Sequence, residues 1–302
     1  MPARTPTWIR QHLAALRALL VLTVVLGIAY PLVILAVAQL PGLKAKADGS
    51  LTTSNGAVVG SRLIGQAFTD AKDNPLPGYF QSRPSAATAN EVTGYDPTAT
   101  SASNLGPESV TDTFDDPATK DEDESAQSLL TQVCTRSLAV GRLDHADGRR
   151  PFCTLSGVGA VLAVFHRGPG YAGPVTRVVS VNEECPTRPF LSSYRGVKVD
   201  CHRFGEDAAA AEQVLIRGDA PARPAVPADA VTASGSGLDP DISPAYARLQ
   251  ANRVAAARHL DPAAVRRLVD QHVTARTLGF LGEPHVNVVD LNLALDRLAG
   301  GR

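Results

Sequence analysis

Apolar positions are densest near the N-terminus, where no charged residue occurs from Ala18 to Leu43. As a helix, the stretch Ala18–Leu40 spans about 35 Å, slightly more than the ~30 Å hydrocarbon core of a bilayer. Pro31 lies inside this stretch and is expected to kink it, which membrane helices tolerate. The pattern predicts a retained transmembrane anchor. A cleaved signal peptide is the alternative, because Ala36-Val37-Ala38 resembles a cleavage site, but the apolar region of a signal peptide usually runs only about 7–15 residues.

The charges that flank this span favour one orientation. Three arginines precede it and two lysines follow it, partly offset by one aspartate: Arg4, Arg10, Arg17, Lys44, Lys46 and Asp48. Because positive charge accumulates on the cytoplasmic side, residues 1–17 are expected inside and the chain from residue 44 outside. No second apolar run is long enough to cross a bilayer, since Val158–Phe165 is much too short. The sequence therefore predicts a single-pass protein of the cell membrane with an extracytoplasmic main domain.

Beyond the span, the pattern alternates between helical and strand periods. A short helix is predicted from Ser125 to Ser137, and strands at Val158–Phe165 and Val175–Val181. In the last third, Ser243 is a predicted N-cap for a helix from Pro244 to about His259, and Asp261 precedes a second helix that starts at Pro262, in a stretch ended by Gly279. A strand is predicted over His285–Val289. A final helix is predicted over Leu291–Leu298, capped by Asp290. This mixture indicates an α+β fold.

Four cysteines occur in the middle of the chain, at Cys134, Cys153, Cys185 and Cys201. In an extracytoplasmic domain, an even number of cysteines favours disulfides. A zinc site is the alternative, but no two of these cysteines lie two to four residues apart. Three disulfide connectivities are possible, and the sequence does not choose among them.

Composition narrows the possible functions. The net charge of −1 offers no basic field for nucleic acid, and 44% hydrophobic residues suffice for a packed core. An acidic run, formed by Asp115, Asp116, Asp121, Glu122, Asp123 and Glu124, is interpreted as a solvated linker. It lacks the ligand spacing of a calcium loop. No metal site is predicted, and His272, on an apolar helix face, is expected to be a hydrogen-bonded structural residue.

The loop Val231–Pro240 is rich in glycine and serine and could suggest catalysis. Ser234 and Ser236 both lack the flanking glycines of a nucleophile elbow, and the chain contains neither a P-loop nor an H-E-x-x-H motif. The loop is interpreted as a special backbone geometry, with Gly235 and Gly237 at angles that a Cβ atom disfavours. An anion bound at the following helix N-terminus is the alternative.

Several ordered motifs resemble the KdpC family, the C subunit of the Kdp potassium-transporting P-type ATPase. The matching stretches are Ser61–Gln66, Tyr79–Ala86, Ser103–Pro107, Val231–Ser243, Gln250 with Arg253–Ala255, and Gly282–Val288 with Leu291–Asp296. The resemblance covers roughly residues 10–111 and 223–298. Residues 112–222, with all four cysteines, are an insert of uncertain borders. Either Ser125–Ser137 or Ala208–Ile216 could match the helix that the family has there.

The resemblance implies an α+β fold in which one N-terminal transmembrane helix, residues 18–40, precedes an extracytoplasmic domain. That domain comprises residues 44–111 and 223–302 and carries the insert as a disulfide-stapled lobe. Structural or docking roles are expected for residues of the matching motifs: Arg83, Asn104, Gly106, Ser234, Gly235, Gly237, Asp239 and Asn287.

The resemblance also implies a non-catalytic accessory subunit of a potassium importer. Its partners would be a potassium-binding A subunit, an ATP-hydrolysing B subunit and a small F peptide. The family's C subunit is described as a catalytic chaperone that raises the ATP affinity of the B subunit, with nucleotide contact at the position of Gln66. Because an extracytoplasmic Gln66 meets little ATP, we expect an indirect effect, with ATP in the complex and no cofactor on this subunit. A membrane-anchored extracytoplasmic hydrolase or binding module is the alternative.

Overall fold

The computed structural model describes residues 6–54, 56–88, 94–100, 105–116, 118, 125–208 and 210–300. The chain forms two compact units, Met1–Leu63 and Ile64–Arg302, which are described separately. Asn104 and Asp121–Glu124 lie outside the described residues.

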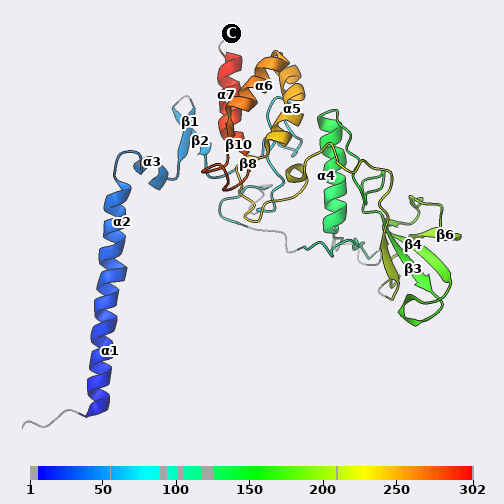
Figure 1. Ribbon diagram of the computed structural model, residues 1–302, viewed down its shortest axis with the longest axis horizontal. Coiled ribbons are helices and arrows are strands. Elements are labelled where there is room, and N and C mark those ends of the chain that lie inside the picture. Colours follow the sequence, from blue (N-terminus) through cyan, green and yellow to red (C-terminus); the bar gives the residue numbers. More distant parts are fainter. Residues whose placement is uncertain are drawn as a thin grey trace, which may run out of the picture. The chain divides into compact units, whose positions relative to one another are not determined.

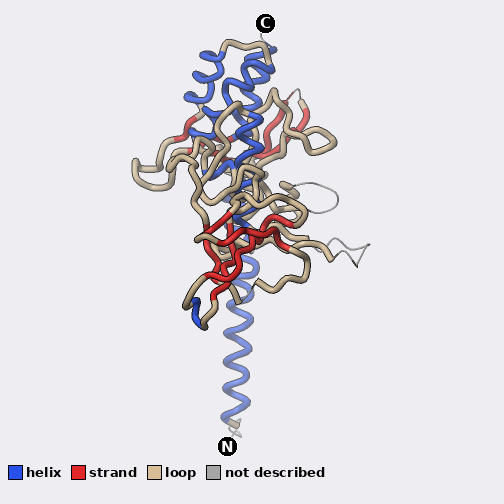
Figure 2. Tube along the Cα trace, turned by 90° about the vertical axis from the view of Figure 1, so that its right-hand side faces the viewer, coloured by secondary structure: helices blue, strands red, loops and turns tan. Residues whose placement is uncertain are grey.

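The first unit begins with one long helix, whose N-terminal part is the blue tube beside the N label in Figure 2. It consists of α1 (Thr7–Val24), a π-helical turn η1 (Val25–Ala29) and α2 (Tyr30–Ala38). The helix Thr7–Ala38 is long and apolar enough to cross a membrane, and none of it is buried in the protein. The wide turn η1 lies just before Pro31, where it relieves the crowding of the proline ring against the preceding turn. Retention of this helix and its orientation stay predictions.

A short helix and a hairpin complete this unit. Helix α3 (Lys44–Ala47) precedes strands β1 (Leu51–Ser54) and β2 (Ala57–Ser61), which pair antiparallel.

The second unit has its main core in the C-terminal third of the chain. Helices α5 (Pro244–Ala257), α6 (Pro262–Gln271) and α7 (Val288–Gly300) lie side by side in Figure 1. They pack with a three-stranded sheet of order β8-β10-β9, formed by Asp241–Ile242, His285–Asn287 and Val273–Thr274. Buried Phe80, Ile242, Leu291 and Leu295 belong to this core.

The predicted starts of α5 and α6 are confirmed, whereas α7 begins at Val288, three residues before the predicted Leu291. The side chains of Ser243 and Asp261 accept hydrogen bonds from the first turns of α5 and α6. Helix α6 ends at Gln271 rather than near Gly279, and the His272 Nδ1 atom at its end lies 2.8 Å from the Leu268 carbonyl oxygen. Helix α7 begins at Val288, so its cap is Asn287, which accepts a hydrogen bond from the Asp290 backbone.

Helix α4 (Leu129–Leu143) joins this core to a second lobe. Its Val133 and Val140 pack on the main core, whereas Leu130 packs on the lobe. The helix follows an N-cap at Ser128, which accepts a hydrogen bond from the Thr131 backbone. Of the two candidates for the family helix, Ser125–Ser137 is thus the one that overlaps a helix, although the helix begins at Leu129 and extends to Leu143.

The lobe is a five-stranded sheet of order β5-β6-β4-β3-β7. Its strands are β3 (Val161–His166), β4 (Val175–Glu184), β5 (Ser193–Tyr194), β6 (Val197–His202) and β7 (Glu212–Leu215), with a short 3-10 turn η2 (Pro169–Tyr171) after β3. The side chains of Val161–Phe165 in β3 pack alternately into two separate apolar clusters, which accounts for the unbroken apolar run there. The alternative match for the family helix, Ala208–Ile216, is wrong, because strand β7 lies within this segment and pairs with β3.

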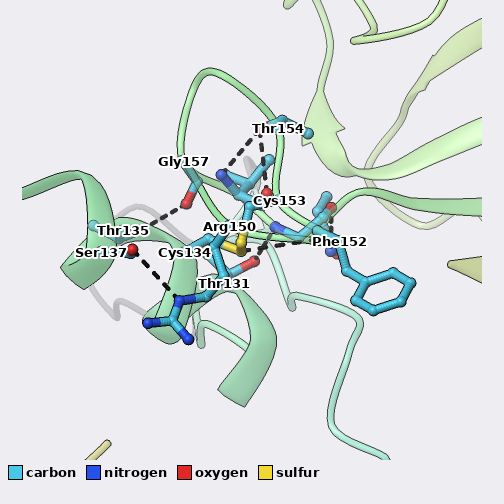
Figure 3. Close-up of a disulfide and its surroundings, with 12 residues drawn as sticks. Thr131, Cys134, Thr135, Ser137, Arg150, Phe152, Cys153, Thr154 and Gly157 are labelled. Carbon is cyan, nitrogen blue, oxygen red and sulfur yellow. Dashed lines mark hydrogen bonds between the residues drawn. A yellow bond between two sulfur atoms is a disulfide. The ribbon is translucent and has the colours of Figure 1, made fainter. Parts of the chain in front are cut away.

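All four cysteines are paired, as predicted, and no zinc site forms from them. Cys134 joins Cys153 and Cys185 joins Cys201, with Cα–Cα distances of 5.5 and 5.1 Å. The first bridge ties α4 to the chain that enters β3 (Figure 3). Beside it, the Thr135 hydroxyl donates to the Gly157 carbonyl at 2.9 Å, and the Thr131 hydroxyl accepts from the Gly159 backbone at 3.0 Å. Helix and lobe are therefore joined both covalently and by hydrogen bonds.

Candidate functional site

The matching motif Tyr79–Ala86 is held in place by two buried side-chain amides, those of Gln250 and Asn292. Gln250 of α5 accepts from the Gln81 backbone N–H at 2.6 Å and donates to the Gln81 carbonyl at 3.1 Å. Asn292 of α7 makes the same pair of hydrogen bonds with Phe80, both at 2.9 Å. An amide presents the donor and acceptor of a peptide group, so each acts like a neighbouring strand. The segment is thereby fixed against two helices, and this sets the position of Arg83.

Arg83 connects this segment to the glycine- and serine-rich loop. Its Nη1 atom donates to Asp239 Oδ2 at 2.8 Å, and its Nη2 atom lies 3.4 Å from the carbonyl oxygens of Thr232 and Ala233. The other carboxylate oxygen of Asp239 accepts from the Asp241 backbone at 3.0 Å. Arg83 and Asp239, both predicted as motif residues, therefore act on each other and close the loop.

Ser85 and Tyr95 hold the same loop from the other side. The Ser85 hydroxyl donates to the Gly237 carbonyl at 2.6 Å and accepts from the Tyr95 backbone at 2.8 Å. The Tyr95 hydroxyl donates to the Arg83 carbonyl at 2.8 Å, and burial raises the pKa of Tyr95 to about 12. Tyr95 is therefore a neutral hydrogen-bond donor at physiological pH.

Gly65 explains why a small residue stands in the motif Ser61–Gln66. Its backbone N–H donates to the Leu238 carbonyl at 2.9 Å. A Cβ atom at this position would collide with the Tyr95 ring and would lie 2.7 Å from the Asp239 carbonyl oxygen. The close approach thus brings three motifs together. We call Gly65, Arg83, Ser85, Tyr95 and residues 231–240 the motif junction.

The glycines of the junction differ in role. Gly237 has a φ of 72°, as predicted, and its N–H donates to the Ser234 hydroxyl at 3.0 Å. The expectation for Gly235 is wrong, because its φ is not positive and a Cβ atom would meet nothing within 4 Å. Gly106 also lacks a positive φ, but a Cβ atom there would meet the Glu108 carboxylate. Asn287 donates to Asp241 at 3.3 Å, outside the junction.

Three cavities surround the junction, and Arg136 of α4 lines all of them. Their volumes are about 280, 210 and 680 Å³, and the largest is also lined by Arg83, Arg142 and Asp73. Arg136 donates to the Val231 carbonyl at 3.1 Å, and burial lowers its pKa below the ordinary value. Because Arg83 is paired with Asp239, the guanidinium groups of Arg136 and Arg142 face one lining carboxylate, Asp73, in the largest of the three cavities.

The linings of the three cavities supply guanidinium, carboxylate, amide and hydroxyl groups. None of the three cavities has a histidine or cysteine in its lining, so no hydroxyl there faces an imidazole base. Among the described residues, no group of three or more His, Cys, Asp or Glu could hold a metal ion. Gln66 accepts a hydrogen bond from the Ser82 hydroxyl at its carbonyl and does not line these cavities.

Sequence reasoning missed Arg136 and a buried ion pair between Arg253 and Asp144. Arg253 Nε donates to Asp144 Oδ1 at 2.7 Å, and its Nη1 atom reaches the carbonyls of Pro77 and Tyr79 at 2.6 and 2.9 Å. Burial raises the pKa of Asp144 despite the nearby charge of Arg253. Arg253 stood in a matching motif, but nothing in the sequence marked its partner 109 residues away.

The fold and the site are those of a protein with one candidate membrane helix and an α+β unit. In that unit, the motif residues hold backbone segments together by hydrogen bonds. A family model described as K+-transporting ATPase, c chain (KdpC), matches residues 12–129 and 201–297. The chain therefore belongs to the KdpC family.

Several similar proteins bear the name potassium-transporting ATPase KdpC subunit. The one from Streptomyces coelicolor is 37% identical over 299 residues, covering 96% of this chain and 93% of its own length. That from Kineococcus radiotolerans is 38% identical, with 95% and 93% covered, and that from Mycobacterium tuberculosis H37Rv is 36% identical, with 96% and 99% covered. The family model leaves residues 130–200 unmatched. Because these relatives are covered almost end to end, they carry a middle region of comparable length.

Proposed function

We propose that this chain is a non-catalytic accessory subunit of the ATP-driven potassium importer Kdp. It assembles with the potassium-binding A subunit, the ATP-hydrolysing B subunit and the small F peptide. Family membership carries this proposal. The motif junction supports it, because the motif residues Arg83, Asp239 and Gly237 hold the fold together through internal hydrogen bonds.

In this proposal the apolar helix is retained, with its N-terminus in the cytoplasm and the second unit outside. Arg4, Arg10 and Arg17, which precede the charge-free stretch Ala18–Leu43, favour this orientation. The pairing of all four cysteines also supports it, because disulfides persist in oxidising compartments and are rare in the cytosol. Residues 112–222 remain the proposed insert within a domain of residues 44–111 and 223–302.

The subunit acts as a catalytic chaperone that raises the ATP affinity of the B subunit indirectly. A domain that binds one conformation of the pump more tightly shifts the population toward that conformation. Coupling free energies of about 1–3 kcal/mol change a ligand's affinity roughly 5- to 150-fold. The buried amide clamps of Gln250 and Asn292 suit this role, because they make a rigid body that can favour one partner shape.

Purification of the complex tests this function. A tagged chain is expected to co-purify with two large polytopic subunits and to lower the Michaelis constant for ATP relative to complexes that lack it. A tagged chain that purifies alone from cells expressing all subunits would contradict the proposal.

Gln66→Ala separates the indirect mechanism from direct nucleotide contact. We expect an assembled complex with this variant to keep its Michaelis constant for ATP within about twofold, since 1.4 kcal/mol of lost contact would already raise it tenfold. Potassium-stimulated ATP hydrolysis at varied ATP is the measurement, with subunit stoichiometry as the control. A several-fold rise with normal assembly, together with photolabelling of this subunit by an ATP analogue, would establish direct contact.

A further inference from the structure

Between β9 and β10 the chain projects as a short ordered loop, residues Arg276–Glu283, which we call the finger. The two strands pair antiparallel at its base, and Arg276 forms an ion pair with Glu283 at 2.6 Å. Further out, Thr277 and Leu281 exchange two backbone hydrogen bonds, each of 2.9 Å. These contacts order the finger from base to tip.

The tip of the finger is apolar and faces solvent. Leu278 is 78% exposed, Phe280 69% and Leu281 50%. Isolated apolar side chains on a surface are ordinary, but three within four residues of one short loop are a concentration of exposed apolar groups of the kind that marks interaction sites.

The backbone at the tip holds Leu278 in an unfavourable conformation. Leu278 has a φ of 55° and Gly279 a φ of 82°, in a turn closed by a 3.3 Å hydrogen bond from Phe280 N–H to the Thr277 carbonyl. Glycine, asparagine and aspartate favour such positions, whereas a leucine there is uncommon. An outlier of this kind, at the most exposed of the three apolar side chains, points to a role for that side chain.

The finger suits a protein partner better than a lipid surface. Its one basic residue, Arg276, is neutralised by Glu283. Residues 273–284 contain no Lys, Trp or Tyr. Segments that bind bilayer surfaces combine basic side chains with interfacial Trp or Tyr, whereas buried aromatic and aliphatic anchors are typical of protein interfaces.

We propose that the finger inserts Leu278 and Phe280 into an apolar pocket of a polytopic subunit of the ATPase. This inference rests on the proposed function. Because the finger is already ordered, little conformational entropy is lost when it binds, and the buried apolar area contributes more fully to affinity.

The first test is a substitution that separates stability from assembly. Leu278→Asn places a residue that tolerates positive φ at the tip, so we expect the full-length chain to be at least as stable to heat as wild type. The same substitution removes the apolar anchor, and recovery of polytopic subunits in a pull-down is expected to fall at least tenfold. Leu155→Asn is the matched control, because Leu155 is 79% exposed in the other lobe. It should leave recovery unchanged.

The second test identifies what the finger touches. A photo-crosslinking amino acid at position 280 of the full-length chain, in the intact complex, is expected to label a polytopic subunit. The same group at position 204 is the control, since Phe204 is 43% exposed and lies outside the finger. Labelling of phospholipid or of a second copy of this chain, or no labelling, would overturn the inference.

The two levels of the proposal fail in different ways. If the wild-type chain does not recover the polytopic subunits, the proposed function fails and the finger inference falls with it. If wild type and Leu278→Asn recover them equally, only the finger inference is wrong.

Discussion

Arg253 and Asp144 form an ion pair that is almost wholly removed from water, with Arg253 also donating to two backbone carbonyls. Moving two charges out of water costs several kcal/mol each, so such a pair adds little net stability over apolar residues of the same size. Breaking it is different, because the remaining charge stays buried without compensation. The pair therefore ties α4 to α5 mainly through the cost of separating its members.

Arg253→Met should lower the free energy of unfolding by about 3–5 kcal/mol at pH 7. Burial already raises the pKa of Asp144 in the folded protein, and loss of the guanidinium raises it further. In the variant, the folded state therefore binds a proton at Asp144 more tightly than the unfolded state does. The free energy of unfolding then falls as pH rises from the unfolded-state pKa to the folded-state pKa of Asp144, and it is regained as pH falls. Denaturant unfolding of the full chain in detergent, between pH 7 and pH 5, measures both effects.

Arg248→Met is the matched control, because Arg248 pairs with Asp270 at 2.8 Å on the surface. Exposed pairs contribute little, so we expect a small loss of stability without the recovery at low pH. Equal losses and equal pH profiles for the two variants would contradict the role assigned to the buried pair.

At this scale, sequence predicts which residues matter better than what they touch. Arg83, Asp239 and Ser234 were singled out, and the structure brings them together at the motif junction. Their partners lie far away in sequence, as Gln81 and Gln250 do at a separation of 169 residues, and no spacing rule reports such contacts. The prediction for Gly235 is wrong because a sequence does not reveal the φ of a glycine.

At the scale of elements, local signals set the helix starts and long-range pairing decides the rest. Ser243-Pro244 and Asp261-Pro262 were sufficient to place α5 and α6, because a cap and a proline act within one turn. The alanine-rich segment Ala208–Ile216 favours a helix by propensity alone. It instead contains a strand, because pairing with β3 outweighs a few tenths of a kcal/mol per residue.

The loop of residues 231–240 leads into β8 and α5, and a substitution in it tests whether its backbone conformation fixes the start of these elements. Gly237→Val puts a β-branched side chain at a φ of 72°, which costs about 1–2 kcal/mol for an ordinary residue and more for valine. It also disturbs the hydrogen bonds with Ser85 and Ser234. We expect a lower melting temperature, weaker assembly and reduced potassium-stimulated ATP hydrolysis through loss of complex.

Gly235→Val, two residues earlier, provides the comparison. Its φ is not positive and the space around it is open, so melting temperature and assembly should stay close to wild type. If both valine variants behave alike, the special backbone at Gly237 is not what the loop requires.

At the scale of the whole molecule, the orientation of the chain in the membrane decides how the subunit can act. An external domain can influence ATP affinity only through the conformation of its partners, whereas a cytoplasmic one could meet nucleotide directly. The apolar helix is predicted equally well from sequence and structure, because its length and composition are local properties. Its orientation depends on the difference in positive charge between residues 1–17 and 44–48. This difference biases insertion in the membrane but leaves no contact within the chain that a structure could show.

Protease accessibility in spheroplasts tests this orientation. With the N-terminus inside, added protease should digest the chain beyond Lys46 and leave a membrane-protected fragment that contains residues 7–38 and an N-terminal tag. A cytoplasmic protein followed in parallel must stay intact, which shows that the membrane is sealed. The fragment also tests retention, because a cleaved signal peptide would leave no tag on the mature chain. Full protection of the second unit, with digestion of the tag, would reverse the topology, and direct contact of this subunit with ATP would then become physically reasonable.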